Sequence, residues 1–86
     1  MTRAGAMTPA ERVMARCDEL ARISSAEGGI ERVYLSPEHA RVNRLVAEWM
    51  REAGMTTRQD AAGNLIGRAG PAAGEAPALV LGSHLD

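Results

Sequence analysis

The 86-residue sequence predicts an α/β fold in which two helices precede about three strands. Two segments carry apolar residues at spacings of three and four, the period of a helix with one buried face. From Met55 onward the apolar runs become short, and turn residues separate them. The last run, residues 78–81, is continuously apolar and is typical of a strand buried on both faces.

The first helix is predicted to begin at the Thr-Pro-Ala-Glu run of residues 8–11. The Thr8 hydroxyl can accept from the Glu11 amide while the carboxylate reaches back, and proline is favoured at the first helical position. Apolar residues follow on one stripe: Val13, Cys17 and Leu20. We expect the stripe to bury the Cys17 thiol, and the glycine pair 28–29 to end the helix.

The second helix has the clearest signals. Ser36 is a good N-cap, with proline and glutamate following it, and Gly54 can supply the left-handed end. Its apolar face comprises Val42, Leu45, Val46, Trp49, Met50 and Ala53. His39, in the first turn, is expected at the solvated surface. Tyr34, in the extended connector before it, is expected to pack under the helix, with substrate contact as the alternative.

Two strands are predicted next, over residues 55–60 and 65–68, close enough to pair as a hairpin. The residues between them, Asp60 to Asn64, favour a turn because Asn and Gly tolerate positive φ. We therefore interpret Asp60 and Asn64 as turn residues rather than as a polar site.

Composition excludes several classes of partner. The net charge of −1 gives no basic surface for nucleic acid or anionic membranes. No apolar run approaches the ~20 residues of a membrane span, and the first ten residues lack a secretory apolar region. One cysteine cannot form an intrachain disulfide, which fits a reducing compartment, so a cytoplasmic location is expected.

The chemically suggestive feature is the segment after the last apolar run. Small residues lead to His84, and Asp86 follows two positions later, which in an extended chain places both side chains on one side. A carboxylate there can hold one ring nitrogen and raise the basicity of the other toward a metal. A structural or simply exposed histidine would show the same spacing. A catalytic zinc also needs roughly three protein ligands.

Four tracts in order resemble one family. They are residues 32–39 (RVYLSPEH), 49–55 (WMREAGM), 60–68 (DAAGNLIGR) and 82–86 (GSHLD). Together they resemble the start of the allantoate amidohydrolase and N-carbamoyl-L-amino-acid hydrolase group, which belongs to the aminoacylase-like, carboxypeptidase-like binuclear metallohydrolases. The resemblance covers roughly residues 10–86.

This resemblance implies that residues 1–86 are the N-terminal portion of a mixed-sheet, zinc-peptidase-like catalytic domain, truncated before its lid and dimerisation domain. It implies that His84 binds one of two divalent ions, zinc or manganese, and that Asp86 orients the histidine. The whole enzyme would hydrolyse linear amide or ureido C–N bonds of a small-molecule substrate such as allantoate or an N-carbamoyl-L-amino acid, as a homodimer.

The other ligands and the catalytic glutamate of the family lie later in the chain, so these residues alone are expected to be inactive. Their strands would lack sheet neighbours and leave apolar edges open, so poor solubility is also expected. A different reading is a small, non-enzymatic, helix-rich binding module whose face around Trp49 docks on a partner. A gene remnant with no function of its own is the third possibility.

Overall fold

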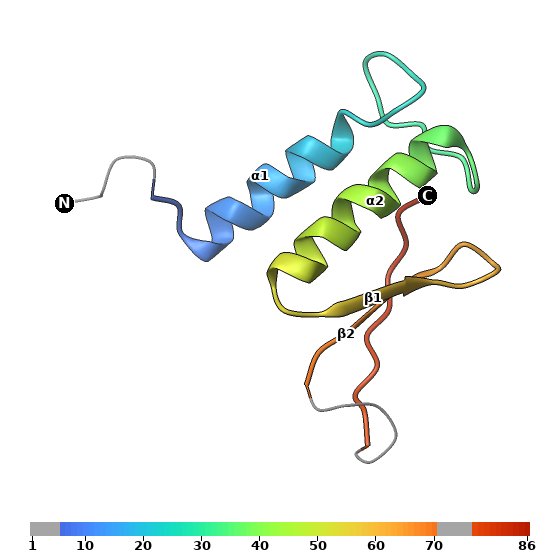
Figure 1. The fold of residues 1–86 in the computed structure, drawn as a ribbon. Coiled ribbons are helices and arrows are strands. Elements are labelled where there is room, and N and C mark those ends of the chain that lie inside the picture. The colour runs from blue at the N-terminus through green and yellow to red at the C-terminus, as the bar shows by residue number, and fades with distance from the viewer. Residues whose placement is uncertain (1–5, 71–76) are drawn as a thin grey trace.

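A computed structural model of the chain describes residues 6–70 and 77–86. The elements are α1 (Pro9–Ala21), α2 (Pro37–Glu52), β1 (Thr56–Gln59) and β2 (Leu65–Arg68). The two helices lie side by side, the strands form a hairpin against α2, and the last segment runs past the hairpin toward α1 and α2 (Figure 1). Two helices followed by a small sheet agree with the expected α/β class at this coarse level.

Helix α1 begins as the sequence predicts. The Thr8 hydroxyl accepts from the Glu11 amide at 3.1 Å, and the Thr8 amide donates to the Glu11 carboxylate at 3.1 Å. These reciprocal bonds satisfy two amides that a helix start leaves without partners. The hydrogen bonds with Thr8 also hold the pKa of the Glu11 carboxyl below its ordinary value.

The predicted end of α1 at the glycine pair is wrong, because the helix stops at Ala21. The Ser24 hydroxyl accepts from the amides of Ala26, at 3.1 Å, and Glu31, at 2.8 Å. A serine side chain that bonds nearby amides offers the backbone an alternative to the helical ladder. Residues 22–33 therefore form a loop that Ser24 holds together.

The predicted burial of Cys17 is also wrong. The thiol is exposed, and no residue of α1 is buried. Arg16 of α1 contacts α2, because its guanidinium carbon lies 4.8 Å from the centre of the Trp49 ring and its Nη2 lies 3.8 Å from the Glu52 carboxylate. An exposed ion pair and one cation–π contact join the helices without enclosing the apolar stripe.

The core lies between α2 and the hairpin. Val42 is fully buried and Ala47 is nearly so. Gly67 of β2 lets the sheet approach closely, because a Cβ there would lie 2.6 Å from the Met50 sulfur. Among the described residues, no helix has both the length and the apolarity needed to cross a membrane.

The hairpin and its turn confirm the prediction. β1 and β2 pair antiparallel, with Thr56 opposite Arg68 and Gln59 opposite Leu65. The Asp60 carboxylate accepts from the amides of Ala62, at 3.0 Å, and Asn64, at 2.9 Å. It also accepts from the Asn64 side chain at 2.9 Å. These bonds close the turn and account for both polar residues without a ligand.

The turn should loosen in acid. The hydrogen bonds from the side chain and amide of Asn64 hold the pKa of Asp60 below its ordinary value of 3.8. A carboxyl with a depressed folded pKa stabilises above the unfolded pKa and loses this contribution as pH falls through the folded one. We expect the Asn64 amide resonance to shift as pH falls below 3.8, and Asp60→Asn to remove that dependence. A variant that titrates like the parent chain would contradict this assignment.

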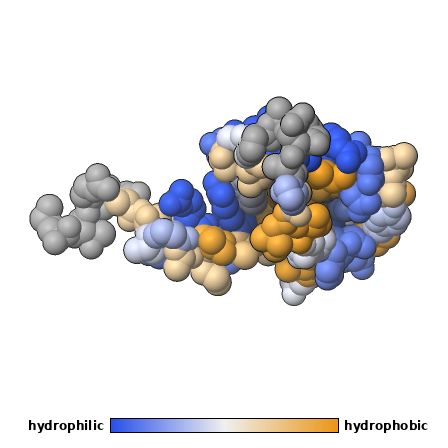
Figure 2. Space-filling model, turned by 90° about the horizontal axis from the view of Figure 1, so that it is seen from below, coloured by the Kyte–Doolittle hydropathy of each residue, from blue (hydrophilic) through white to orange (hydrophobic). Residues whose placement is uncertain are grey.

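The predicted third strand is wrong in this structure. Residues 78–81 carry no strand, and Leu79, Val80 and Leu81 are 88%, 85% and 86% exposed. A strand needs a neighbour for its ladder, and none of the described residues pairs with this segment. Figure 2 shows apolar surface gathered on the face of the molecule seen from below.

Candidate functional site

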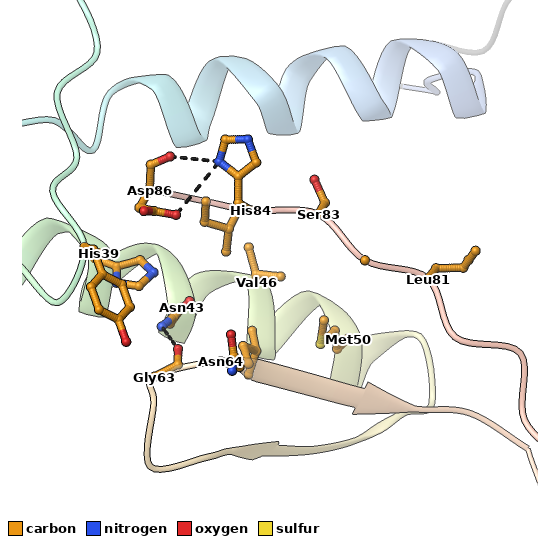
Figure 3. Close-up of a pocket in the computed structure, with 14 residues that line it drawn as sticks. His39, Asn43, Val46, Met50, Gly63, Asn64, Leu81, Ser83, His84 and Asp86 are labelled. Carbon is orange, nitrogen blue, oxygen red and sulfur yellow. Dashed lines mark hydrogen bonds and ion pairs between the residues drawn. The ribbon is translucent and has the colours of Figure 1, made fainter.

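A hollow of about 500 Å³ lies between the last segment, α2 and the hairpin turn. The segment 81–86 forms one wall, and His84 and Asp86 are on it. The opposite wall includes His39, Asn43 and Met50 of α2. Figure 3 shows the segment passing between α1 and α2 with the hairpin beyond α2. The hollow therefore brings the end of the chain beside residues more than thirty positions earlier.

His84 and Asp86 face one another, as their spacing predicts. The His84 Nδ1 atom lies 3.0 Å from the main-chain oxygen of Asp86, to which it donates, and 3.8 Å from the carboxylate Oδ1 (Figure 3). The closer partner is thus the main chain, not the carboxylate. A proton held on Nδ1 leaves the lone pair of Nε2 available. The side chain of His84 is 83% exposed.

This donor set fits one ligand of a metal centre. An imidazole with one nitrogen engaged by oxygen atoms and the other free is the form in which histidine binds zinc or manganese. Within residues 6–70 and 77–86, no three His, Cys, Asp or Glu side chains lie together in a group that could hold an ion. The described residues thus supply one imidazole and one neighbouring carboxylate.

The expected solvation of His39 is wrong, since this residue is only 6% exposed. Its Nδ1 atom accepts the amide of Leu35 at 2.9 Å, so the proton of the neutral ring is on Nε2. Leu35 has a positive φ of 62°, which few non-glycine residues adopt. His39 is the third residue of α2, and this helix position often caps preceding amides, a signal that the sequence contained.

Tyr34 and Asn43 attach the hairpin turn to α2. The Tyr34 hydroxyl donates to the main-chain oxygen of Ala62, and the Asn43 side chain donates to that of Gly63 at 3.3 Å. The Tyr34 ring also lies 5.7 Å from the His39 ring, centre to centre. Tyr34 is half-exposed rather than packed under the helix. These bonds fix the wall opposite His84.

Arg32 is a residue of this region that the sequence did not single out. Its guanidinium donates to three main-chain oxygens, those of Leu20, Ile23 and Leu85. The first two belong to the end of α1 and the loop after it, and the third lies between His84 and Asp86. A basic residue followed by apolar residues in the connector 30–35 was the available signal.

Comparison with known proteins finds relatives that are named as a deiminase and as amidohydrolases. It is 42% identical over 76 residues to "Allantoate deiminase 2" of Glycine max, which covers 88% of this chain and 16% of that protein. It is 42% identical over 81 residues to "N-carbamoyl-L-amino acid amidohydrolase" of Geobacillus stearothermophilus, covering 93% of this chain and 20% of that protein. The chain is thus a homologue of these proteins over most of its own length.

A further member of the group is "N-carbamoyl-L-amino-acid amidohydrolase" of a Pseudomonas species, which is 40% identical over 77 residues. The chain spans between 16% and 20% of the length of these amidohydrolases. No family model matches the chain. No solved structure matches it either.

Proposed function

We propose that this chain is the N-terminal portion of the catalytic domain of a metal-dependent amidohydrolase that cleaves linear amide or ureido C–N bonds. The observation that carries the proposal is the state of His84. One of its ring nitrogens is engaged by Asp86 and the other is free beside a hollow of about 500 Å³. The mixed-sheet, peptidase-like domain that the sequence suggests belongs to the same proposal.

The names of the relatives support a ureido substrate. Proteins about 40% identical to this chain are named for allantoate and for N-carbamoyl-L-amino acids. Both compounds carry a linear ureido group. We therefore take the substrate to be a small molecule with such a group. The alternative, a non-enzymatic binding module or gene remnant, has no comparable support.

The chain's own contribution is to hold and orient a metal ligand. In our proposal, His84 Nε2 binds one of two divalent ions, zinc or manganese, and Asp86 keeps the ring in the tautomer that leaves Nε2 free. When bound, such a pair of ions lowers the pKa of a water and polarises the substrate carbonyl. The remaining ligands and the general base would come from other parts of the protein. The proposed assembly is a homodimer in the cytoplasm.

Hydrolysis assays test the proposal. We expect the purified protein that carries this chain to release ammonia from allantoate or from an N-carbamoyl-L-amino acid. A chelator should abolish turnover, and zinc or manganese should restore it, because the ions activate the attacking water. The 86-residue chain alone should be inactive, since its described residues supply only one imidazole ligand.

Two other outcomes would count against the proposal. Hydrolysis of N-acetyl amino acids or dipeptides with no action on ureido compounds would show that the substrate class is wrong. Full activity in the presence of excess chelator, after removal of bound ions, would show that the metal-dependent mechanism is wrong.

A further inference from the structure

Arg32 makes an unusual set of contacts for a residue outside any helix or strand. The guanidinium Nη1 donates to the main-chain oxygens of Leu20, at 2.8 Å, and Ile23, at 2.9 Å. Its Nε donates to the main-chain oxygen of Leu85 at 2.5 Å. The side chain is half-buried, so these bonds are shielded in part from competing water. Hydrogen bonds from a charged donor are roughly twice as strong as neutral ones.

The bond to Leu85 bridges two distant parts of the chain. Within the part of the chain that the structure describes, it is the one hydrogen bond that joins residues 77–86 to residues 6–70. The exposed apolar residues 79–81 form no backbone hydrogen bonds of a sheet that would hold the segment to the described residues. The path of the last segment therefore depends strongly on Arg32.

The position of this anchor matters for the candidate ligand. Leu85 lies between His84 and Asp86, so fixing its carbonyl fixes the peptide plane that joins it to Asp86. In extended backbone the flanking side chains point to one side, and their direction follows the plane between them. The guanidinium also lies at the C-terminal end of α1, where the partial negative charge of the last carbonyls favours its positive charge.

We infer that Arg32 is a positioning residue that clamps Leu85 to the end of α1 and thereby aims the imidazole of His84 at the metal. This inference rests on the proposed function. The clamp needs the planar fork of a guanidinium, whose donors diverge in fixed directions toward carbonyls from separate segments. A lysine would keep the charge but not this geometry.

Metal titration of the protein that carries this chain tests the inference. We expect Arg32→Ala to weaken zinc affinity, measured by competition with a chelator, by roughly 10-fold to 100-fold, the usual effect of losing an outer partner of a ligand. Arg32→Lys should recover little of this loss. Added guanidinium ion should restore affinity to Arg32→Ala and not to Arg32→Lys, which a general loss of stability would not produce.

Arg44→Ala is the matched control, because Arg44 is exposed on α2 and its side chain makes no hydrogen bond to a described residue. Its zinc affinity should equal that of the parent. Affinity in Arg32→Ala within twofold of the parent would overturn the inference. So would affinity that falls and does not respond to guanidinium.

A second measurement separates the clamp from the proposed function and serves if Arg32→Ala does not fold. In the parent protein, the Arg32 Nε–H proton should exchange slowly with water, and the Leu85 carbonyl carbon should shift in Arg32→Lys. If the parent binds no zinc, the proposed function fails while these signals still report the clamp. Fast exchange in a parent that does bind zinc would refute the clamp alone.

Discussion

Replacing His84 with alanine should remove one metal ligand and reduce hydrolysis of a ureido substrate by more than roughly 100-fold, beyond the usual effect of losing an outer partner. The reason is that His84 Nε2 has no substitute among the described residues, where no three metal-binding side chains lie together. Metal content, measured by atomic emission on the purified protein, should fall together with activity.

Two variants sharpen this test. Asp86→Asn removes the negative charge 3.8 Å from His84 Nδ1 but keeps the main-chain oxygen at 3.0 Å, so its loss should be smaller. His39→Gln removes the other histidine of the chain, which bonds the Leu35 amide. We expect it to lower thermal stability and to leave metal content unchanged. Normal metal content and turnover in His84→Ala would exclude His84 as a ligand.

Replacing Gly63 with alanine should destabilise the protein more than the same change at Gly54 or Gly82. Gly63 has a φ of +88°, where an L-residue costs about 1–2 kcal/mol. A Cβ there would also lie 2.8 Å from Leu35 Cδ2, so the exposed Leu35 side chain would have to shift. Chemical unfolding of the protein that carries the chain measures the loss.

Two other glycines separate the backbone strain at Gly63 from its contact with Leu35. Gly54 has a φ of +91° but open space around its Cβ position, so Gly54→Ala reports the backbone term alone. Gly82 has open space and no positive φ, so Gly82→Ala should be nearly neutral. An equal loss in Gly63→Ala and Gly54→Ala would show that the contact with Leu35 contributes nothing.

Features set by neighbours in sequence could be predicted. The Thr8 cap, the turn at Asp60 and the meeting of His84 with Asp86 each involve groups no more than four residues apart. Over such distances the backbone geometry of a helix start, a tight turn or an extended segment already brings the partners together. The role of His84 as a ligand stays a prediction of that local geometry and of the family resemblance.

Features that depend on which segments meet could not be predicted in the same way. Apolar periodicity suggested burial for Cys17, and a continuous apolar run suggested it for residues 78–81. All are exposed, because α1 and the last segment have few partners among the described residues. His39 was expected in solvent and is instead buried, since its ring accepts the Leu35 amide and lies 5.7 Å from the Tyr34 ring, centre to centre.

By itself the sequence determined where α2 and β2 begin, how the hairpin turns and which two residues stand together at the end of the chain. Only the tertiary structure showed that Arg32 links the end of α1 to Leu85. Arg32 and Leu85 are 53 positions apart in the sequence. The physical reason is range. Capping and turn hydrogen bonds form between residues close in sequence. Burial and hydrogen bonds between distant segments form only when the whole chain folds.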